Sequence, residues 1–221
     1  MGDAWGSRRR RRDPPLTAQP LTAQPLTLPS PQRGEGFVRV LAGALKGQRL
    51  TTPRGRTTRP TADQVRIACL DTLMPFLDAG PFLDLFAGAG GVGIEALSRG
   101  APSAVFVEQD GAALRALRDN VERLGLADQA RVMRADAARA VTELEAAGER
   151  FGIVFLDPPY DSPRAAVALE TVAARRVLVA GAVVVIQHGT KTPPSDAPGA
   201  LALWKARRFG ETTLTFFRSD A

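Results

Sequence analysis

The sequence predicts an α/β fold built on a mostly parallel sheet, and three observations support this prediction. From residue 82 onward, five short apolar segments alternate with four segments of helical periodicity, a rhythm typical of βαβ units. A Gly-x-Gly-x-x-Gly motif follows the first apolar segment. Two more apolar segments, joined by a turn at Gly210, end the chain like an antiparallel hairpin. We therefore expect a Rossmann-like sheet of seven strands with helices on both faces.

The expected elements follow one another closely from residue 82 to residue 217. The seven strands are predicted at residues 82–86, 104–107, 131–134, 153–156, 182–186, 201–207 and 212–217. The helices are predicted near residues 92–98, 111–124, 137–146 and 163–172. Residues 81–221 are therefore expected to form one domain.

Residues 1–36 differ in composition from the rest of the chain. They contain an arginine run at residues 8–12 and two copies of Pro-Leu-Thr-Ala-Gln, starting at Pro15 and Pro20. A repetitive, Pro-rich stretch buries too little apolar surface to fold, so we expect a disordered tail. Three interpretations remain open: a basic arm that follows RNA phosphates, a tail without a role, and a translation start assigned too far upstream.

Residues 37–80 predict a small extension ahead of the sheet. Residues 37–41 and 48–52 are expected to form two strands of a hairpin, and residues 62–77 a helix with Thr61 as its N-cap. Four apolar residues spaced four apart share one face of this helix: Val65, Cys69, Leu73 and Leu77. This face is expected to pack on the main domain.

The extension is strongly basic. Its cations up to residue 66 are Arg39, Lys46, Arg49, Arg54, Arg56, Arg59 and Arg66. Asp63 is the single anion in the same stretch. Clustered cations of this kind predict a surface that faces nucleic acid, and the alternative is a solvated hairpin without a partner.

The composition of the whole chain narrows the function further. The net charge is +6 and the sequence pI is about 10.6, which favours a polyanionic partner. Cys69 is the only cysteine and His188 the only histidine, which excludes a multi-cysteine zinc site and any mechanism that needs two histidines. The longest apolar run, residues 177–186, is too short to cross a bilayer, and we expect neither a membrane span nor a signal peptide.

The glycine motif predicts a nucleotide-like cofactor. Gly88, Gly90 and Gly93 lie where a tight turn, bare backbone and close helix packing are needed. Glu108 ends the next strand, where a carboxylate can accept two ribose hydroxyls. These residues suit a nicotinamide cofactor as well as S-adenosylmethionine. Asp84 favours the latter, because a carboxylate repels a pyrophosphate and attracts an ammonium or sulfonium group.

Asp136 ends the third predicted strand of the repeat. It can reach the amino group of a bound adenine, and it can equally cap the following helix.

The fourth strand of the repeat ends in Asp157-Pro158-Pro159-Tyr160. The two prolines fix the backbone and predict a rigid corner that presents the Asp157 carboxylate and the Pro158 carbonyl. Two such acceptors can bind both hydrogens of an exocyclic base amine and pull its lone pair out of conjugation with the ring. Tyr160 can then stack on the extruded base. The alternative is an ordinary strand-end turn.

With this corner in place, the chain resembles the class I methyltransferases that modify base amines. From about residue 38 to residue 217 it is most similar to the RsmD family of bacterial 16S rRNA (guanine-N2)-methyltransferases. The motifs that carry the resemblance are Arg39-Val40-Leu41-Ala42-Gly43 with Lys46-Gly47, Arg59-Pro60-Thr61 with Val65-Arg66, residues 84–99, and residues 157–160.

The resemblance implies S-adenosylmethionine as the cofactor. It places Phe86, Gly88 and Gly90 against the cofactor, Asp84 at its amino group, Glu108 at the ribose and Asp136 at the adenine. It places residues 157–160 around the target guanine, and it implies that the RNA contacts the extension. The residues expected in this RNA contact are Arg39, Lys46, Arg54, Arg56, Arg59 and Arg66.

The resemblance also implies a cytoplasmic, monomeric, metal-free enzyme that acts on 16S rRNA within an assembling small ribosomal subunit. The chain departs from the family pattern at Gln64, Ile67 and Leu70-Asp71, which affects the expected RNA face and leaves the cofactor site unchanged. Three other functions remain open: an adenine-N6 methyltransferase of DNA or RNA, a nucleotide-binding oxidoreductase, and an RNA-binding module without catalytic activity.

Overall fold

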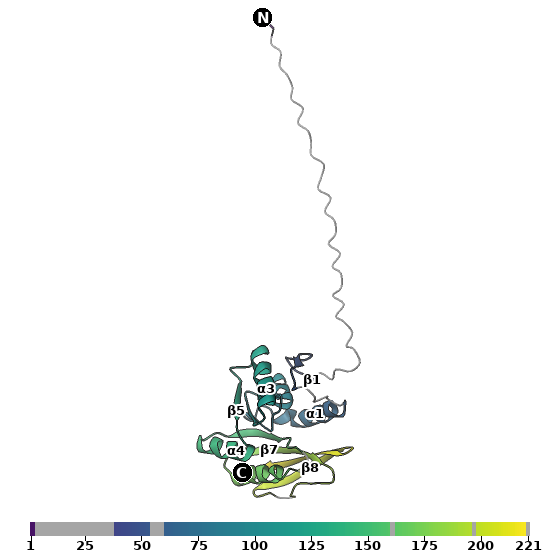
Figure 1. The fold of residues 1–221 in the computed structure, drawn as a ribbon, viewed down its shortest axis with the longest axis vertical. Helices are drawn as coiled ribbons and strands as arrows, with labels where there is room; N and C mark the ends of the chain where they lie inside the picture. The colour runs from purple at the N-terminus through teal and green to yellow at the C-terminus, as the bar shows by residue number, and fades with distance from the viewer. Residues whose placement is uncertain (3–37, 54–59, 160–161, 196–197, 220–221) are drawn as a thin grey trace. The chain divides into compact units, whose positions relative to one another are not determined.

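A computed structural model describes residues 1–2, 38–53, 60–159, 162–195 and 198–219 (Figure 1). The chain divides into two units, Met1–Arg33 and Gly34–Ala221, and every helix and strand with described bounds belongs to the second unit. The expected tail lies outside the described residues except for Met1 and Gly2. No helix among the described residues is long and apolar enough to cross a membrane.

The main sheet has seven strands, which confirms the predicted fold class. Their bounds are β3 Phe82–Leu85, β4 Ala104–Glu108, β5 Ala130–Arg134, β6 Phe151–Leu156, β7 Leu178–Gly189, β8 Leu201–Phe209 and β9 Thr212–Ser219. Strands β3 to β7 are parallel, whereas β9 runs antiparallel between β7 and β8. The spatial order is β5-β4-β3-β6-β7-β9-β8. The chain therefore reverses its winding between β3 and β6, and a crevice at such a point is where this type of sheet binds ligands.

Strand β7 is longer than the sequence pattern predicted. The apolar run indicated residues 182–186, but the strand spans Leu178–Gly189. Gly181, at a φ of 69°, lies where the pairing of β6 with β7 shifts its register. The irregularity at this glycine separates two paired segments that the sequence pattern alone did not connect.

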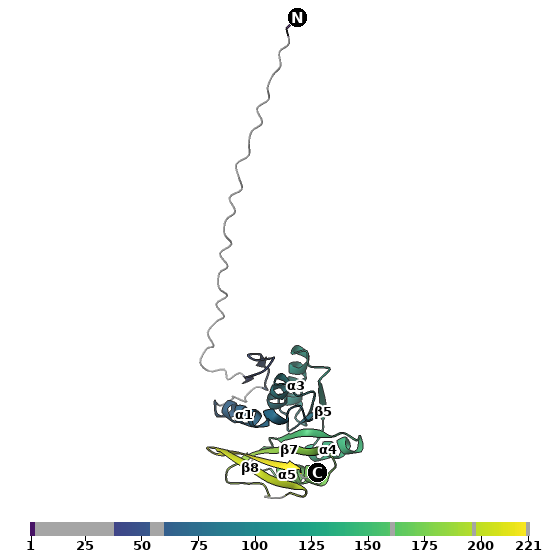
Figure 2. The same ribbon diagram turned by 180° about the vertical axis from the view of Figure 1, so that it is seen from behind.

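Helices cover both faces of the sheet. Their bounds are α1 Pro60–Leu73, α2 Gly91–Ser98, α3 Gly111–Arg123, α4 Ala137–Ala146 and α5 Arg164–Ala174. Helices α1, α2 and α3 share one core with the large side chains of one face of the sheet, including Phe82, Phe106 and Phe155. Helices α4 and α5 pack with Leu83, Leu85 and the other residues that alternate with these. Figures 1 and 2 show α1 and α3 together on one side of the sheet.

The helix of the extension begins and ends earlier than the sequence predicted. It starts at Pro60, a residue favoured at the first helical position, so Thr61 lies inside the helix and is not its N-cap. It ends at Leu73 and continues as a 3-10 turn over Met74–Phe76. Pro75 explains this end, since proline has no N–H to donate to the preceding turn. The predicted apolar face is buried, with Val65, Cys69, Leu73 and Leu77 all at most 3% exposed.

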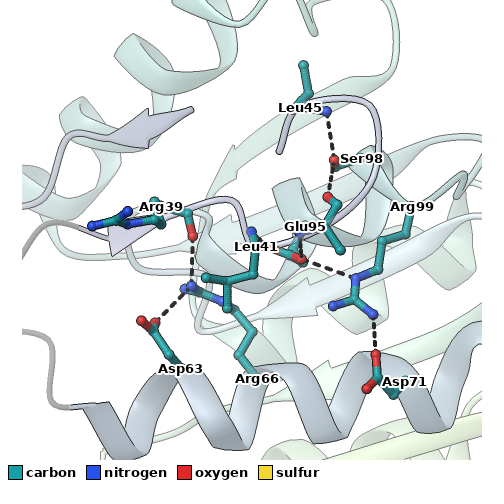
Figure 3. A network of polar contacts seen from close by, with 10 residues as sticks. Arg39, Leu41, Leu45, Asp63, Arg66, Asp71, Glu95, Ser98 and Arg99 are labelled. Atoms are coloured by element: carbon teal, nitrogen blue, oxygen red, sulfur yellow. Dashed lines mark hydrogen bonds and ion pairs between the residues drawn. The ribbon is translucent and has the colours of Figure 1, made fainter. Parts of the chain in front are cut away.

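A buried carboxylate fastens the hairpin of the extension to the main domain. The hairpin has only two paired residues per strand, β1 Val38–Arg39 and β2 Arg49–Leu50. Beside it, the Glu95 carboxylate on α2 accepts from the backbone N–H groups of Leu41 at 2.7 Å and Ala42 at 2.8 Å. Arg99 pairs with Glu95 at 3.1 Å (Figure 3). A two-stranded hairpin is marginal alone, so these contacts are needed to hold it.

The hairpin loop lies so close to the end of α2 that residue 43 has to be a glycine. The Ser98 hydroxyl donates to the Ala42 carbonyl at 2.6 Å and accepts from the Leu45 N–H at 2.9 Å. At Gly43, with a φ of 82°, an added Cβ would lie 1.9 Å from the Ser98 carbonyl oxygen. Any side chain at this position would therefore push the loop off α2.

Candidate cofactor and substrate site

The glycine loop joins β3 to α2, and its glycines have different physical roles. At Gly88, with a φ of 57°, no atom lies within 4 Å of the position that a Cβ would take, so the loop presents bare backbone there. At Gly93 a Cβ would lie 2.4 Å from the Phe106 ring, so this glycine permits close packing of α2 on the sheet. Phe86 adopts a φ of 65°, the single positive value among the described residues other than glycine. Backbone of this kind concentrates at binding sites.

Glu108 connects the glycine loop to the end of β4. Its carboxylate accepts from the Gly88 N–H at 2.7 Å and from the N–H groups of Gln109 and Asp110, also at 2.7 Å. Two carboxylate oxygens offer about four acceptor positions, so a ligand hydroxyl can still be bound. The side chain thus lies where the sequence predicted a ribose contact, and it also holds the loop.

Asp84 lies beneath the glycine loop rather than on its surface. It is 1% exposed and accepts from the Gly93 N–H at 2.9 Å. Burial raises the pKa of Asp84 to about 8, a rise that the Gly93 hydrogen bond opposes and that the nearby charges of Asp157 and Glu108 reinforce. Three carboxyl groups therefore converge at this end of the sheet, and a cationic ligand would relieve their repulsion.

The Asp157 corner lies beside the glycine loop. The Asp157 N–H donates to the carbonyl of Leu85, the last residue of β3, at 3.4 Å. Asp157 is half-buried, Pro158 buried and Pro159 exposed. Tyr160, the fourth residue of the predicted corner, lies outside the described residues. The structure thus brings the first three residues of the corner to the same end of the parallel strands as Gly88.

A cavity of about 190 Å³ adjoins this corner, and no pattern in the sequence indicated it. Its lining includes Pro158, Ser162, Leu169, Gln187 and Pro194. His188 also lines it, but both of its ring nitrogens are bonded, to the Gly189 carbonyl and to the Thr215 hydroxyl, each at 2.8 Å. Because a carbonyl oxygen only accepts, Nδ1 donates to Gly189, and Nε2 shares a hydrogen bond with the Thr215 hydroxyl.

Asp136 caps helix α4, one of the two roles that the sequence allowed. Its carboxylate accepts from the N–H groups of Ala138 at 3.1 Å and Arg139 at 3.4 Å. The side chain is exposed. Contact with an adenine remains a prediction for this residue.

Asn120 is a buried residue of α3 that sequence reasoning missed. Its amide oxygen accepts from the Thr51 N–H at 2.8 Å, and its amide nitrogen donates to the carbonyls of Thr51 at 2.9 Å and Ala89 at 3.0 Å. One fully buried amide therefore ties the end of the hairpin to the glycine loop. The available signal was an asparagine between Leu117 and Val121 on an otherwise apolar helix face.

The predicted RNA-contacting cations fall into three groups. Arg39 and Lys46 are exposed on the hairpin. Arg66 has a side chain only 10% exposed, donates to the Arg39 carbonyl at 2.8 Å and pairs with Asp63 at 2.9 Å (Figure 3). Burial lowers the pKa of Arg66. Arg54, Arg56 and Arg59 lie outside the described residues.

The comparisons with known proteins identify the family of this chain. The family model described as Conserved hypothetical protein 95 matches residues 38–218. Ribosomal RNA small subunit methyltransferase D of Escherichia coli is 38% identical over 127 residues, which are 58% of this chain and 62% of that protein. This chain belongs to the RsmD family.

Two further proteins cover more of the chain. YlbH of Bacillus subtilis, provisionally described as an rRNA methyltransferase, is 35% identical to this RsmD-family chain over 82% of it and 98% of YlbH. The solved structure of the T. thermophilus 16S rRNA N2 methyltransferase RsmC, in complex with AdoMet and guanosine, superposes with a TM-score of 0.63. It is 21% identical and covers 83% of this chain and 49% of RsmC, so this likeness concerns the fold.

Proposed function

We propose that this RsmD-family chain transfers a methyl group from S-adenosylmethionine to the exocyclic N2 amine of a guanine in bacterial 16S rRNA. The name of the Escherichia coli relative supports small-subunit rRNA as the substrate, and the RsmC complex with AdoMet and guanosine supports the cofactor and the guanine amine. The structural observation that carries the proposal is the Asp157 corner, hydrogen-bonded to β3 directly before the glycine loop. Cofactor and target amine would therefore meet at one point.

The residues around the glycine loop fit a cationic cofactor with a ribose. Bound S-adenosylmethionine supplies an electrophilic methyl group on a sulfonium. The bare backbone at Gly88 leaves room for the ligand, and Glu108 can still accept a ribose hydroxyl. The Glu108 carboxylate provides negative charge that favours a cation over a pyrophosphate, and a bound cation would favour the ionised form of Asp84. Asp84 acts at a distance or through water, because it is 1% exposed.

The Asp157 corner orients the guanine amine. Its carboxylate and the Pro158 carbonyl accept the two amine hydrogens, which turns the nitrogen lone pair toward the methyl group. The methylated nitrogen would then pass its extra proton to the Asp157 carboxylate, or through it to water, so no histidine base is needed. This agrees with His188, whose two ring nitrogens are already hydrogen-bonded. Tyr160 would stack on the extruded base.

We also propose that the enzyme acts as a monomer, in the cytoplasm, on 16S rRNA within an assembling small ribosomal subunit. The family resemblance supports this setting. Among the described residues, no group of three or more histidines, cysteines or carboxylates is arranged to hold a metal ion.

The deciding experiment is transfer of labelled methyl to 16S rRNA and to small subunits from a strain that lacks the enzyme, followed by nucleoside analysis. N2-methylguanosine is the expected product. N6-methyladenosine would show that the target base is an adenine and not a guanine. A protein that binds S-adenosylmethionine but labels neither the rRNA nor the subunits would refute the proposed substrate.

Replacing Asp157 tests the mechanism separately. Asp157→Ala should lower the rate of transfer by about a hundredfold or more, as loss of a catalytic hydrogen-bonding group does. The dissociation constant of S-adenosylmethionine, measured by calorimetry, should stay within a few-fold of the wild-type value. Transfer within a few-fold of the wild-type rate would show that Asp157 does not hold the amine.

A further inference from the structure

The edge strand β8 exposes aromatic and apolar side chains beside cations. Trp204 is 40% exposed and the neighbouring Leu203 is 49% exposed. Lys205 follows them on the same strand, and Arg218 lies on the adjacent strand β9. Neither sequence reasoning nor the site described above uses this surface.

The Trp204 ring is held in a defined position. It meets Phe76 edge-on at 5.6 Å and Phe216 edge-on at 6.1 Å between ring centroids. The Lys205 ammonium lies 4.1 Å from the Trp204 centroid, and the Arg218 guanidinium lies 4.5 Å from the Phe76 centroid. A rigid, partly exposed indole flanked by cations is what a nucleobase and its phosphates require.

The cations of this surface keep their charge available. The ion pairs between described residues involve Arg66, Arg99, Arg131, Arg139 and Arg175. Within that part of the chain, Lys205, Arg207, Arg208 and Arg218 are in none of them. Arg207 donates weakly to the Ala68 carbonyl at 3.4 Å and to the Thr72 hydroxyl at 3.3 Å on α1, two neutral acceptors.

The register of the sheet fixes the position of this surface relative to the active site. One row of paired residues crosses from β6 to β8: Leu156, Ile186, Thr215 and Ala206. Asp157 and Arg207 each follow this row by one residue, and both lie toward the carboxyl end of the parallel strands. Three strand spacings of about 4.8 Å separate them, which is roughly 14 Å. A strand of RNA whose target base lies at Asp157 can therefore reach Arg207 with its next few nucleotides.

We infer that the α1-facing side of the β8–β9 hairpin, formed by Trp204, Lys205 and Arg207 of β8 and Arg218 of β9, binds the single-stranded rRNA that flanks the target nucleotide. The inference rests on the proposed function, because it takes Asp157 as the position of the target base. Phosphates pair with the three cations, and a flanking base stacks on the exposed part of Trp204.

The competing explanation is that the β8 side chains protect the edge of the sheet from pairing with another chain. This explains the cations but not the tryptophan. Lysine and arginine on an edge strand prevent pairing with another chain. A partly exposed tryptophan does the opposite, since it makes the edge attractive to other molecules. The combination therefore favours a binding surface, and the positive charge favours RNA as its occupant.

Trp204 itself provides the first test. The chain has two tryptophans, Trp5 and Trp204, so a Trp5→Phe variant leaves Trp204 as the single indole probe. Titration with unmethylated 16S rRNA should change the fluorescence of this variant and protect it from acrylamide quenching. Unchanged emission and quenching at RNA concentrations that saturate binding would overturn the inference.

The second test removes two cations. In a Lys205→Ala, Arg207→Ala double variant, the KM for rRNA should rise several-fold, with kcat and cofactor affinity unchanged. The slope of log affinity against log salt should fall by about 0.7 for each phosphate that is no longer neutralised. Arg134→Ala is the matched control, because Arg134 is an exposed cation on β5, the opposite edge of the sheet.

Equal rRNA affinity and salt slope in the double variant and in the Arg134→Ala control would refute the inference and leave the proposed function intact. Normal activity on naked rRNA with a defect only on small subunits would also refute it, since the surface would then bind a ribosomal protein. Wild-type protein that methylates no RNA would instead refute the proposed function.

Discussion

Burial and a hydrogen bond act in opposite directions on the pKa of Asp84, and the effect of burial is the larger. Transfer of a carboxylate into the interior disfavours its ionised form, while the Gly93 N–H stabilises it. With the pKa raised to about 8, the folded protein near neutral pH keeps a proton at Asp84 that the unfolded chain releases. The residue therefore makes stability depend on pH.

The sign of this dependence follows from proton binding. The ordinary pKa is 3.8 and the folded value about 8, so the native state binds more protons between these limits. The contribution of Asp84 to the free energy of unfolding should fall as pH rises through this window and become constant above it. Asp84→Asn should remove this decline, so the variant should gain stability relative to wild type toward pH 8. Urea unfolding of both proteins at a series of pH values would measure it, and parallel pH profiles would contradict it.

Residue types and spacing predicted Asp84, Glu108 and Asp157 as members of one site, and the structure brings them to one end of the sheet. Sequence could not show that the Glu108 carboxylate holds Gly88, because the two residues are 20 positions apart. The same applies to Asn120, whose partners Thr51 and Ala89 are 69 and 31 positions away. Long-range hydrogen bonds leave no periodic pattern in a sequence.

At the scale of elements, strand and helix positions were predictable because the core is regular. Buried parallel strands are continuous apolar runs, and α3 has a strongly one-sided apolar face. The errors occur where backbone chemistry overrides that pattern. Pro60 and Pro75 set the ends of α1 and the start of its 3-10 turn, and Gly181 extends β7 through an irregularity.

The hairpin loop gives the sharpest prediction at this scale, because it offers a matched pair of glycines. Gly43 and Gly47 both have positive φ, 82° and 86°. An alanine Cβ would lie 1.9 Å from the Ser98 carbonyl at Gly43, and it would meet nothing within 4 Å at Gly47. Gly47→Ala should cost about 1–2 kcal/mol, the usual strain of a left-handed residue, and Gly43→Ala clearly more.

Thermal unfolding and RNA affinity of the two glycine variants would check this prediction. We expect Gly43→Ala to lower rRNA affinity as well, because the hairpin must leave α2. Equal decreases in stability in both variants would mean that close contact with Ser98 does not hold the loop.

At the scale of the whole molecule, the alternation of strands and helices predicted a seven-stranded sheet, but not its strand order. The order β5-β4-β3-β6-β7-β9-β8 depends on which strands pair after the chain reverses its winding. The strand pairing depends on how the helices pack on the two faces of the sheet. Helices α1, α2 and α3 pack on one face, and α4 and α5 pack on the other. Because β3 pairs with β6 in this order, Asp157 lies beside the end of β3, where the glycine loop begins.

The core of the second unit uses residues from Val38 onward, which leads to a prediction about the N-terminal residues. Removal of residues 1–36 should leave the midpoint of thermal unfolding within about 2 °C of the full-length value, since the described core begins at Val38. Differential scanning calorimetry of both chains would measure this. A drop of several degrees would show that these residues stabilise the folded unit.

The attachment of the hairpin to α2 also has a consequence for the order of folding. The N–H groups of Leu41 and Ala42 donate to Glu95, and Thr51 is bonded through both its N–H and its carbonyl to Asn120. Two helices that begin 40 to 70 residues later in the chain must therefore be in place before the hairpin can form. During synthesis the hairpin emerges from the ribosome before α2 and α3 and acquires its structure after them. The hairpin that carries Arg39 and Lys46 therefore becomes stable only once the glycine loop and the two helices after it have formed.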